Sequence, residues 1–346
     1  MVSRFDGCYT AIITPMSSDL RVDYEGLGRL VDFQAEESVS GIVAVGTTGE
    51  SPTLDWEEHN RVLTTVHERI NGRCLAIGGT GSNSTREALK ATEYASDVGV
   101  KAILLVDPYY NGPSSIEIRR EYVEPIAKKF PEIQLIPYVI PGRTGTQLLP
   151  QDLAILHSQL PNVNAVKEAT GNLDNMKLTR KLCGEDFSIL SGDDDRTYEM
   201  MTNSEIHASG VISVASNIAP RAIQKFTQSI LERNLDESSR LHKVLAPLFS
   251  MITVKTQEET PFGSSICKAR NPLPLKTLMN ILGMVAGPCR PPLGKMTKKG
   301  LETVLNVAKT IQEKTPEILR PIEDFFDVDI DARLRDETCW RGLSYD

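Results

Sequence analysis

Several features that define common classes of protein are missing from this sequence. Its six cysteines are scattered, and none forms a Cys-x-x-Cys pair or lies at a spacing from histidine that suits zinc. No apolar run reaches the roughly 18 residues of a membrane-spanning helix. Residues 1–6 lack the apolar segment of a signal peptide. We therefore expect a cytoplasmic protein with reduced cysteines, no bound metal and no membrane partner.

Positive charge is also in the minority. The chain has 46 acidic and 38 basic residues among 346, which gives a formal net charge of −8. This excess argues against general binding to nucleic acid or to an anionic membrane, although a local basic site for a small carboxylate is compatible with it. The apolar fraction of 40% is ordinary for a globular chain, and a chain of this length can still form one large α/β unit.

Short apolar runs recur along the first two thirds of the chain, each bounded by Gly, Pro or Asp. They are nearly continuous rather than alternating, which is typical of parallel strands covered on both faces. There are eight of them, at residues 9–14, 42–47, 74–78, 102–107, 134–140, 163–167, 187–190 and 211–214.

Helical patterns fill the gaps between these runs. The helix from residue 56 begins behind Asp55, a good N-cap with Glu58 three residues further on. The predicted helices span residues 24–38, 56–71, 86–98, 115–130, 150–160, 172–183 and 196–202. Eight alternating units predict an α/β fold with a closed (β/α)8 TIM barrel, and the alternative is a doubly wound open sheet.

The pattern changes after the eighth strand. Helices are predicted without intervening strands, at residues 219–231, 235–249, 275–282 and 297–313. The polar segment 256–271 predicts a loop or hairpin, and the acidic residues 315–346 predict a tail that is ordered against a partner subunit or mobile. We therefore expect a barrel at 1–218 that carries the active site, a C-terminal helical region at 219–314 and an acidic extension at 315–346.

One lysine, Lys167, lies inside a buried apolar run at residues 163–167. Burial disfavours the ammonium form and lowers its pKa. A neutral amine beside a carbonyl substrate is a nucleophile that forms a Schiff base. The alternative from this stretch alone is a structural lysine paired with Glu168 or another carboxylate.

Other candidates for chemistry follow the predicted strands at their carboxyl ends, where TIM barrels carry their active sites. They are Thr47, Thr48, Tyr109, Tyr110, Tyr138, Arg143 and Gly192. Each has a structural alternative: a core tyrosine, a turn closed by threonines or a solvated loop arginine. Because all of them fall at one end of the predicted barrel, we expect them to form one site.

Two further clusters favour structural roles. Asp193, Asp194 and Asp195 are adjacent, as metal ligands can be, but carboxylates on a loop before a helix more often cap it or face solvent. Residues 78–82 are rich in glycine, but they lack the spacing of the known phosphate-binding loops, so a tight turn is the better interpretation.

Five motifs, in their order and spacing, resemble those of the dihydrodipicolinate synthase family. They are Gly46-Thr47-Thr48-Gly49-Glu50-Ser51, Pro108-Tyr109-Tyr110-Asn111, Arg143-Thr144-Gly145, Lys167-Glu168-Ala169-Thr170-Gly171-Asn172 and Ser191-Gly192-Asp193-Asp194. The resemblance covers roughly residues 5–312. The first and fourth motifs are specific for the pyruvate-dependent class I aldolases. Their long forms, with the fifth motif, favour the synthase over N-acetylneuraminate lyase or a keto-sugar-acid aldolase.

The resemblance implies four catalytic side chains. Lys167 would form a Schiff base with pyruvate, and Tyr138 would act as the general acid and base beside it. Thr47 would link Tyr138 to Tyr110 in a relay of hydroxyls, with Tyr110 reaching in from a neighbouring subunit. The resulting enamine would attack L-aspartate 4-semialdehyde, and no metal or organic cofactor would be needed.

The resemblance also implies substrate-binding residues. Thr48 would bind the carboxylate of pyruvate, and Arg143 would orient the carboxylate of the second substrate, a task suited to a guanidinium. Gly192 and Ile212 would line the pocket near the lysine. The family resemblance further implies a homo-oligomer, a tight dimer within a tetramer.

In this family, free L-lysine often binds at the dimer interface. It is the end product of the lysine biosynthesis pathway in which these synthases act. The positions here that resemble that site are Ser51, Trp56, His59, Asn83, Glu87 and Tyr109. Amide, carboxylate and phenol groups could hold the charged ends of an amino acid, and the alternative is a polar interface without a ligand.

The sequence departs from the family pattern in three respects. Val139 stands where the family usually has asparagine, and Gly142 stands where a serine is common. Segment 256–271 and the tail after residue 315 exceed the usual length. The first two departures bear on the aldehyde substrate, which leaves another pyruvate aldolase as the alternative function. A non-catalytic barrel is a third hypothesis, which the set of catalytic side chains disfavours.

Overall fold

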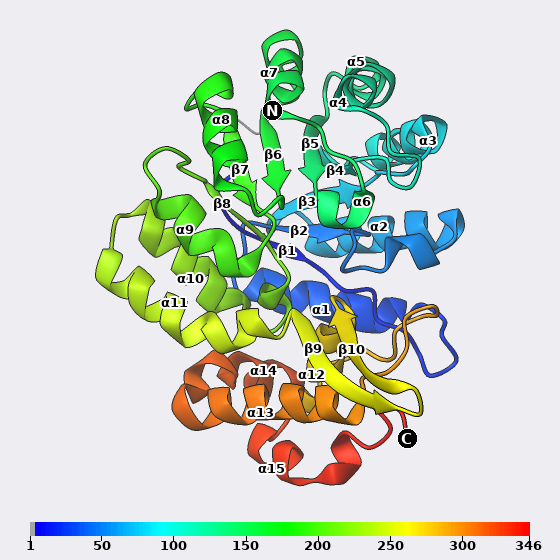
Figure 1. Cartoon of the computed structure of the whole chain (residues 1–346), viewed down its shortest axis with the longest axis vertical. Helices are drawn as coiled ribbons and strands as arrows, with labels where there is room; N and C mark the ends of the chain where they lie inside the picture. The colour runs from blue at the N-terminus through cyan, green and yellow to red at the C-terminus, as the bar shows by residue number, and fades with distance from the viewer. Residues whose placement is uncertain (1–3) are drawn as a thin grey trace.

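Eight parallel strands close into a barrel in the computed structural model, which describes residues 4–346 (Figure 1). Each strand pairs with the next along the chain, and the eighth pairs with the first. The strands are β1 (Gly7–Ala11), β2 (Gly41–Ala44), β3 (Leu75–Gly79), β4 (Ala102–Val106), β5 (Gln134–Val139), β6 (Ala165–Glu168), β7 (Ser188–Ser191) and β8 (Gly210–Ser213). The predicted TIM barrel is therefore confirmed, and the open doubly wound sheet is excluded.

Helices follow the barrel strands, close to the predicted positions. They are α1 (Tyr24–Glu36), α2 (Trp56–Ile70), α3 (Thr85–Asp97), α4 (Ser115–Glu117), α5 (Glu124–Lys129), α7 (Pro150–Gln159), α8 (Leu173–Cys183), α9 (Thr197–Thr202) and α10 (Pro220–Leu231). The predicted cap is present, because the Asp55 side chain accepts from Glu58 N at 2.8 Å and Glu58 accepts from Asp55 N. The helix expected at 115–130 contains a π-helical turn, η2 (Ile118–Val123), which the sequence pattern did not predict.

The strands are buried on both faces, which explains their continuous apolar runs. Most of the core lies between the barrel and its helices, and a smaller cluster fills the barrel interior. Tyr138, Ala169, Leu190 and Ile212 belong to this inner cluster, and Lys167 lies beside it on β6. The inner cluster therefore supplies an apolar surrounding for the one amine that the sequence singled out.

Beyond the barrel the chain forms a helix, a hairpin and two more helices. These are α11 (Leu235–Ser250), β9 (Thr253–Thr260), β10 (Gly263–Arg270), α12 (Leu273–Leu282) and α13 (Lys298–Lys314). The segment predicted as a loop or hairpin is an antiparallel hairpin, and Figure 1 shows it beside α13, where the C-terminal helices gather. The appended helices confirm the predicted C-terminal appendage.

The acidic tail forms short helices that pack on its own chain, an arrangement that the sequence did not predict, and its order against a partner subunit stays a prediction. It forms η5 (Pro316–Ile318), α14 (Arg320–Phe326), α15 (Ile330–Arg335) and η6 (Glu337–Cys339). Ile322, Phe326, Ile330 and Leu334 are buried, and Arg333 donates to Ile281 O and Asn280 O at the end of α12. Apolar residues at helical spacing were hidden among the aspartates, and they make this segment part of the core. The divisions at residues 218 and 314 remain predictions.

Candidate active site

Lys167 is a buried amine at the carboxyl end of the barrel. It lies on β6, directly opposite Tyr138 of β5 in the strand register, and its side chain is 5% exposed. Its Nζ lies 4.2 Å from the centre of the Tyr138 ring. Burial lowers the pKa of Lys167 to about 8, although the nearby Asp193 and Asp194 oppose this shift. A useful fraction of this amine is therefore neutral near pH 7, as a Schiff-base nucleophile requires.

This pKa predicts how imine formation depends on pH. Only the neutral amine attacks a ketone, and its fraction increases as the pH rises through the folded-state pKa of about 8. We expect the initial rate of borohydride-trapped pyruvate adduct to rise between pH 6 and 9 with a midpoint near 8. A midpoint near 10.5, the ordinary lysine value, would show that burial does not activate this amine.

Tyr138 and Thr47 form the hydroxyl pair beside this amine. The Tyr138 phenol is buried, and burial raises its pKa well above the ordinary value, while Arg143 and a hydrogen bond with the Thr47 side chain act in the opposite direction. A phenol that stays protonated can donate a proton and receive it back. The sequence prediction that these two side chains meet is therefore matched by the structure.

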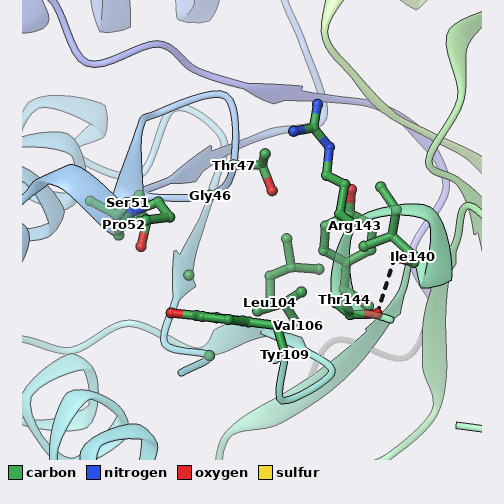
Figure 2. Close-up of a pocket in the computed structure, with 14 residues that line it drawn as sticks. Gly46, Thr47, Ser51, Pro52, Leu104, Val106, Tyr109, Ile140, Arg143 and Thr144 are labelled. Carbon is green, nitrogen blue, oxygen red and sulfur yellow. Dashed lines mark hydrogen bonds between the residues drawn. The ribbon is translucent and has the colours of Figure 1, made fainter. Parts of the chain in front are cut away.

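Six of the eight predicted catalytic and substrate-binding residues line a cavity of about 250 Å³. Its wall includes Thr47, Thr48, Tyr138, Arg143, Lys167, Ala169, Gly192, Asp193, Thr253, Lys268, Arg270 and Asn271. A second cavity of about 240 Å³ shares Thr47, Tyr138 and Arg143 and continues to Ser51 and Tyr109. Figure 2 shows Thr47 and Tyr109 on opposite sides of the second cavity. The two hollows form one site at the carboxyl ends of the strands, as expected for this barrel.

Asn271 holds the two predicted carboxylate-binding residues, and sequence reasoning missed it. Its Nδ2 donates to Thr48 Oγ1 at 3.0 Å, and its backbone carbonyl accepts from Arg143 Nη2 at 3.1 Å. The Oδ1 atom of Asn271 is buried and has no partner among residues 4–346. Asn271 directly follows β10, so the hairpin is anchored at the active site.

Gly192 and Ile212 differ in how they relate to the pocket. A Cβ atom at Gly192 would lie 2.7 Å from Ala169 Cβ and 3.2 Å from Lys167 Cε, so the wall beside the amine has no room for a side chain. Ile212 on β8 is fully buried in the inner cluster, and its side chain is not part of the cavity wall. The structure therefore brings Gly192 to the site and leaves Ile212 beneath it.

Tyr110 does not reach the site of its own chain. Its backbone has a left-handed φ of 79°, and its side chain is 91% exposed. Neither cavity wall includes it, whereas the preceding residue Tyr109 lines the second cavity. A large exposed phenol held in a strained backbone conformation is consistent with a role outside its own chain.

The six residues of the predicted lysine site have different surroundings. Ser51 and Tyr109 line the second cavity, while Asn83 and Trp56 are exposed. His59 is buried, bonds to the Gly79 carbonyl at 2.9 Å and lies against the Trp56 ring at 4.9 Å. Glu87 accepts from Ser82 Oγ at 2.6 Å. Ser51 and Tyr109 therefore face the second cavity, and the His59 ring is hydrogen-bonded to the backbone of β3.

A buried ion pair under the Thr47–Thr48 turn was also missed. Lys276 Nζ lies 2.7 Å from Glu50 Oε1, and the two side chains are 1% and 0% exposed. The same ammonium donates to the carbonyls of Thr14 and Pro288, and Glu50 Oε2 accepts from Arg290 N. The available signal was Lys276 itself, a single charge within the apolar helix α12. This network fixes the turn that carries the hydroxyls of Thr47 and Thr48.

Asp194 and Gly79 have structural roles, whereas Asp193 lines the cavity that contains Lys167. Asp194 is buried and accepts from Ser213 Oγ, Val214 N and Ala215 N, which ties the loop after β7 to β8. A Cβ at Gly79 would lie 2.5 Å from Val45 O, so close packing explains this glycine. Among residues 4–346 no group of three or more His, Cys, Asp or Glu side chains is arranged to hold a metal ion. The same part of the chain contains no helix long and apolar enough to span a membrane.

Comparison with known proteins now identifies the family. The model of the dihydrodipicolinate synthetase family matches residues 4–312. The chain belongs to this family. A relative of this chain is the 4-hydroxy-tetrahydrodipicolinate synthase of Methanococcus maripaludis. The two are 39% identical over 303 residues, which are 87% of this chain and 97% of the relative. The family match ends before η5, so the tail from Pro316 lies beyond it.

Solved structures of synthetase family members have the same fold. The enzyme from Cyanidioschyzon merolae with lysine bound is 32% identical, with a TM-score of 0.80 over 89% of this chain and 98% of that chain. The chloride-inhibited enzyme from Acinetobacter baumannii complexed with pyruvate is 34% identical, with a TM-score of 0.80 over 88% and 98%. The resemblance predicted from five motifs is therefore confirmed along most of the chain.

Proposed function

We propose that this chain is a 4-hydroxy-tetrahydrodipicolinate synthase, a lyase that condenses pyruvate with L-aspartate 4-semialdehyde on the route to diaminopimelate and lysine. The observation that carries this proposal is the buried Lys167 amine, with its lowered pKa, beside the hydrogen-bonded hydroxyls of Tyr138 and Thr47. Relatives that carry this enzyme name support it. We also propose a cytoplasmic location, on the sequence grounds given above.

The geometry supports a specific course for the first half-reaction. The lone pair of neutral Lys167 Nζ attacks the ketone carbon of pyruvate, and loss of water leaves an iminium. The positive nitrogen accepts electrons as a methyl proton leaves, which gives an enamine. The centre of the Tyr138 ring lies 4.2 Å from Lys167 Nζ, and this proximity supports the proposal that its hydroxyl moves these protons. Thr48 and its hydrogen-bond partner Asn271 line the same cavity as Lys167, where they would bind the carboxylate of pyruvate.

The second half-reaction joins the two substrates. The methylene carbon of the enamine attacks the aldehyde carbon, the aldehyde oxygen takes up a proton, and the iminium re-forms. The amino group of the second substrate then attacks the iminium carbon and displaces the Lys167 amine, which closes the ring and frees the enzyme. The guanidinium of Arg143, which lines this cavity, would orient the carboxylate of the second substrate through two N–H donors. Every proton in this course moves between substrate, water and the side chains of the site, including the Tyr110 that we propose comes from the neighbouring subunit.

A coupled assay with pyruvate and L-aspartate 4-semialdehyde tests the proposed reaction, and L-lysine tests the proposed effector. We expect turnover with this pair, and inhibition by lysine that weakens when Trp56 is replaced by alanine, since Trp56 is an exposed ring beside buried His59. The Cyanidioschyzon merolae relative, solved with lysine bound, supports the second expectation. Turnover of N-acetylneuraminate instead of the semialdehyde would reject the synthase, and an unchanged rate and melting temperature with lysine would reject the effector.

The exposed Tyr110 leads to a prediction about assembly. We propose a homo-oligomer, built from tight dimers within a tetramer, in which each Tyr110 completes the relay of its neighbour. Lys167→Ala and Tyr110→Phe are each expected to be nearly inactive alone. When they are co-expressed, a mixed dimer contains one site with both native side chains, so activity is expected to return.

The control for this experiment pairs Lys167→Ala with Tyr138→Phe. Both side chains belong to the same chain's site, so each site of that mixed dimer lacks one of them and no activity is expected to return. Size-exclusion chromatography with light scattering reports the oligomer. Recovery in neither mixture would contradict a Tyr110 that acts across subunits.

A further inference from the structure

The β9–β10 hairpin presents one face to the core and the other to the mouth of the active site. Residues that are paired across the hairpin point to the same side, and sides alternate along each strand. Val254, paired with Ala269, is buried against the core. The opposite face therefore carries two neighbouring pairs, Thr253 with Arg270 and Lys255 with Lys268. Thr253, Lys268 and Arg270 line the cavity that contains Lys167.

The hairpin is fixed to the substrate-binding residues at its end. Asn271, the residue after β10, bonds to both Thr48 and Arg143. Arg270 Nη1 donates to the carbonyl of Gly142 at 3.4 Å. A Cβ at Gly142 would meet no atom within 4 Å, so the glycine leaves open space beside this arginine. The positions of Lys268 and Arg270 are thus set relative to the site.

Positive charge accumulates on this face without a carboxylate partner among the residues that the structure describes. Lys255, Lys268, Arg270 and Arg143 form no ion pair among the residues that the structure describes. Lys255 and Lys268 lie directly opposite each other, an arrangement of like charges that destabilises a hairpin. Arg270 is the largest cause of a lowered Lys268 pKa, with smaller contributions from Lys255 and Arg143.

Two carboxylates lie near this face, and the four cationic side chains outnumber them. Asp193 lines the same cavity, and Asp195 lines a neighbouring hollow together with Lys255 and Lys268. Burial raises the pKa of Asp193 to about 6, which reduces its negative charge in slightly acidic solution. The chain as a whole is acidic, with a net charge of −8, so this mouth has the opposite sign to the molecule. Such a local field attracts anions and increases their rate of entry.

We propose that the β9–β10 hairpin is the recognition element for the second substrate, and that Lys268 and Arg270, with Arg143, bind the carboxylate of the incoming aldehyde. This inference rests on the proposed function. It adds two specificity-determining residues from a segment that is longer here than in the family pattern. It also assigns a use to the unpaired like charges, because a bound carboxylate would relieve their repulsion.

The experiment is a KM comparison of the double variant Lys268→Ala/Arg270→Ala with the wild type. Loss of two charged donors is expected to raise KM for L-aspartate 4-semialdehyde about tenfold or more. KM for pyruvate and the yield of borohydride-trapped adduct are expected to stay within about twofold, since Lys167 is buried below the hairpin face. An unchanged KM for the aldehyde, or an equal rise for both substrates, would overturn the proposal.

Two variants separate recognition from a merely structural role. Lys298→Ala removes one positive charge from the exposed start of α13 and is expected to behave as wild type. Lys268→Arg/Arg270→Lys keeps both charges and is expected to restore most of the aldehyde affinity. The wild-type KM for the aldehyde is expected to rise with salt more steeply than that of the double alanine variant. Failure of the charge-conserving variant to recover would contradict recognition by charge.

A binding measurement distinguishes failure of this inference from failure of the proposed function. Succinate semialdehyde has the aldehyde and the carboxylate but no amino group. Its affinity is measured by calorimetry on enzyme whose Lys167 has been reduced onto pyruvate, so no turnover is required. Weaker binding by the double alanine variant supports the hairpin site even if the coupled assay shows no product. Equal affinity overturns the inference even if the enzyme is an active synthase.

Discussion

Replacing Lys167 with alanine is expected to abolish the pyruvate adduct and to reduce turnover by at least about 1,000-fold. The reason is that the bond between Nζ and the ketone carbon of pyruvate cannot form, and the other lysine of this cavity wall, Lys268, is an exposed residue of the β9–β10 hairpin. Mass spectrometry after borohydride treatment measures the adduct, and the coupled assay measures turnover.

Lys101→Ala is the matched control. Lys101 is an exposed lysine just before β4, at the opposite end of a barrel strand from the active site, and it is expected to keep full adduct yield and turnover. An adduct that persists in Lys167→Ala protein would mean that another amine reacts with pyruvate. Borohydride labelling of a peptide without Lys167 in the wild type would lead to the same conclusion.

Lys276→Met is expected to lower the free energy of unfolding by about 3–5 kcal/mol, the usual cost of leaving a buried charge without its partner. Glu50 is fully buried, and it would keep only the backbone N–H of Arg290 as a donor among the described residues. Its repulsion from nearby carbonyl oxygens of Thr14 and Pro288, which also lose their donor, adds to the cost. Urea unfolding followed by circular dichroism measures the change.

The double variant Glu50→Gln/Lys276→Met tests whether the buried charge is the cause. A neutral amide still accepts from Arg290 N, and methionine fills most of the lysine volume, so much of the lost stability is expected to return. If the single variant is as stable as the wild type, the ion pair does not hold this region together. A lower affinity for pyruvate in the single variant is also expected, since Glu50 ends the Thr47–Thr48 turn.

The repeating part of the fold could be predicted because its cause is local. A parallel strand with both faces buried must be apolar at nearly every position, and eight such runs alternated with helical patterns. The capping box at Asp55 could also be predicted from the sequence. The packing of the tail was missed because charged residues obscured its apolar spacing, and the π-helical turn at Ile118–Val123 was missed as well.

The sequence by itself determined the barrel, the family and the side chains that follow the strands, because strand ends in a closed parallel barrel meet at one rim. Lys167 and Tyr138 could be brought together in this way, since they lie on adjacent strands. Only the tertiary structure decided that Asn271 holds Thr48, that Lys276 neutralises Glu50 and that the hairpin turns Lys268 towards the mouth. Each of these contacts joins residues about a hundred or more positions apart, and no local pattern specifies them, because they depend on how the C-terminal elements fold back over the rim.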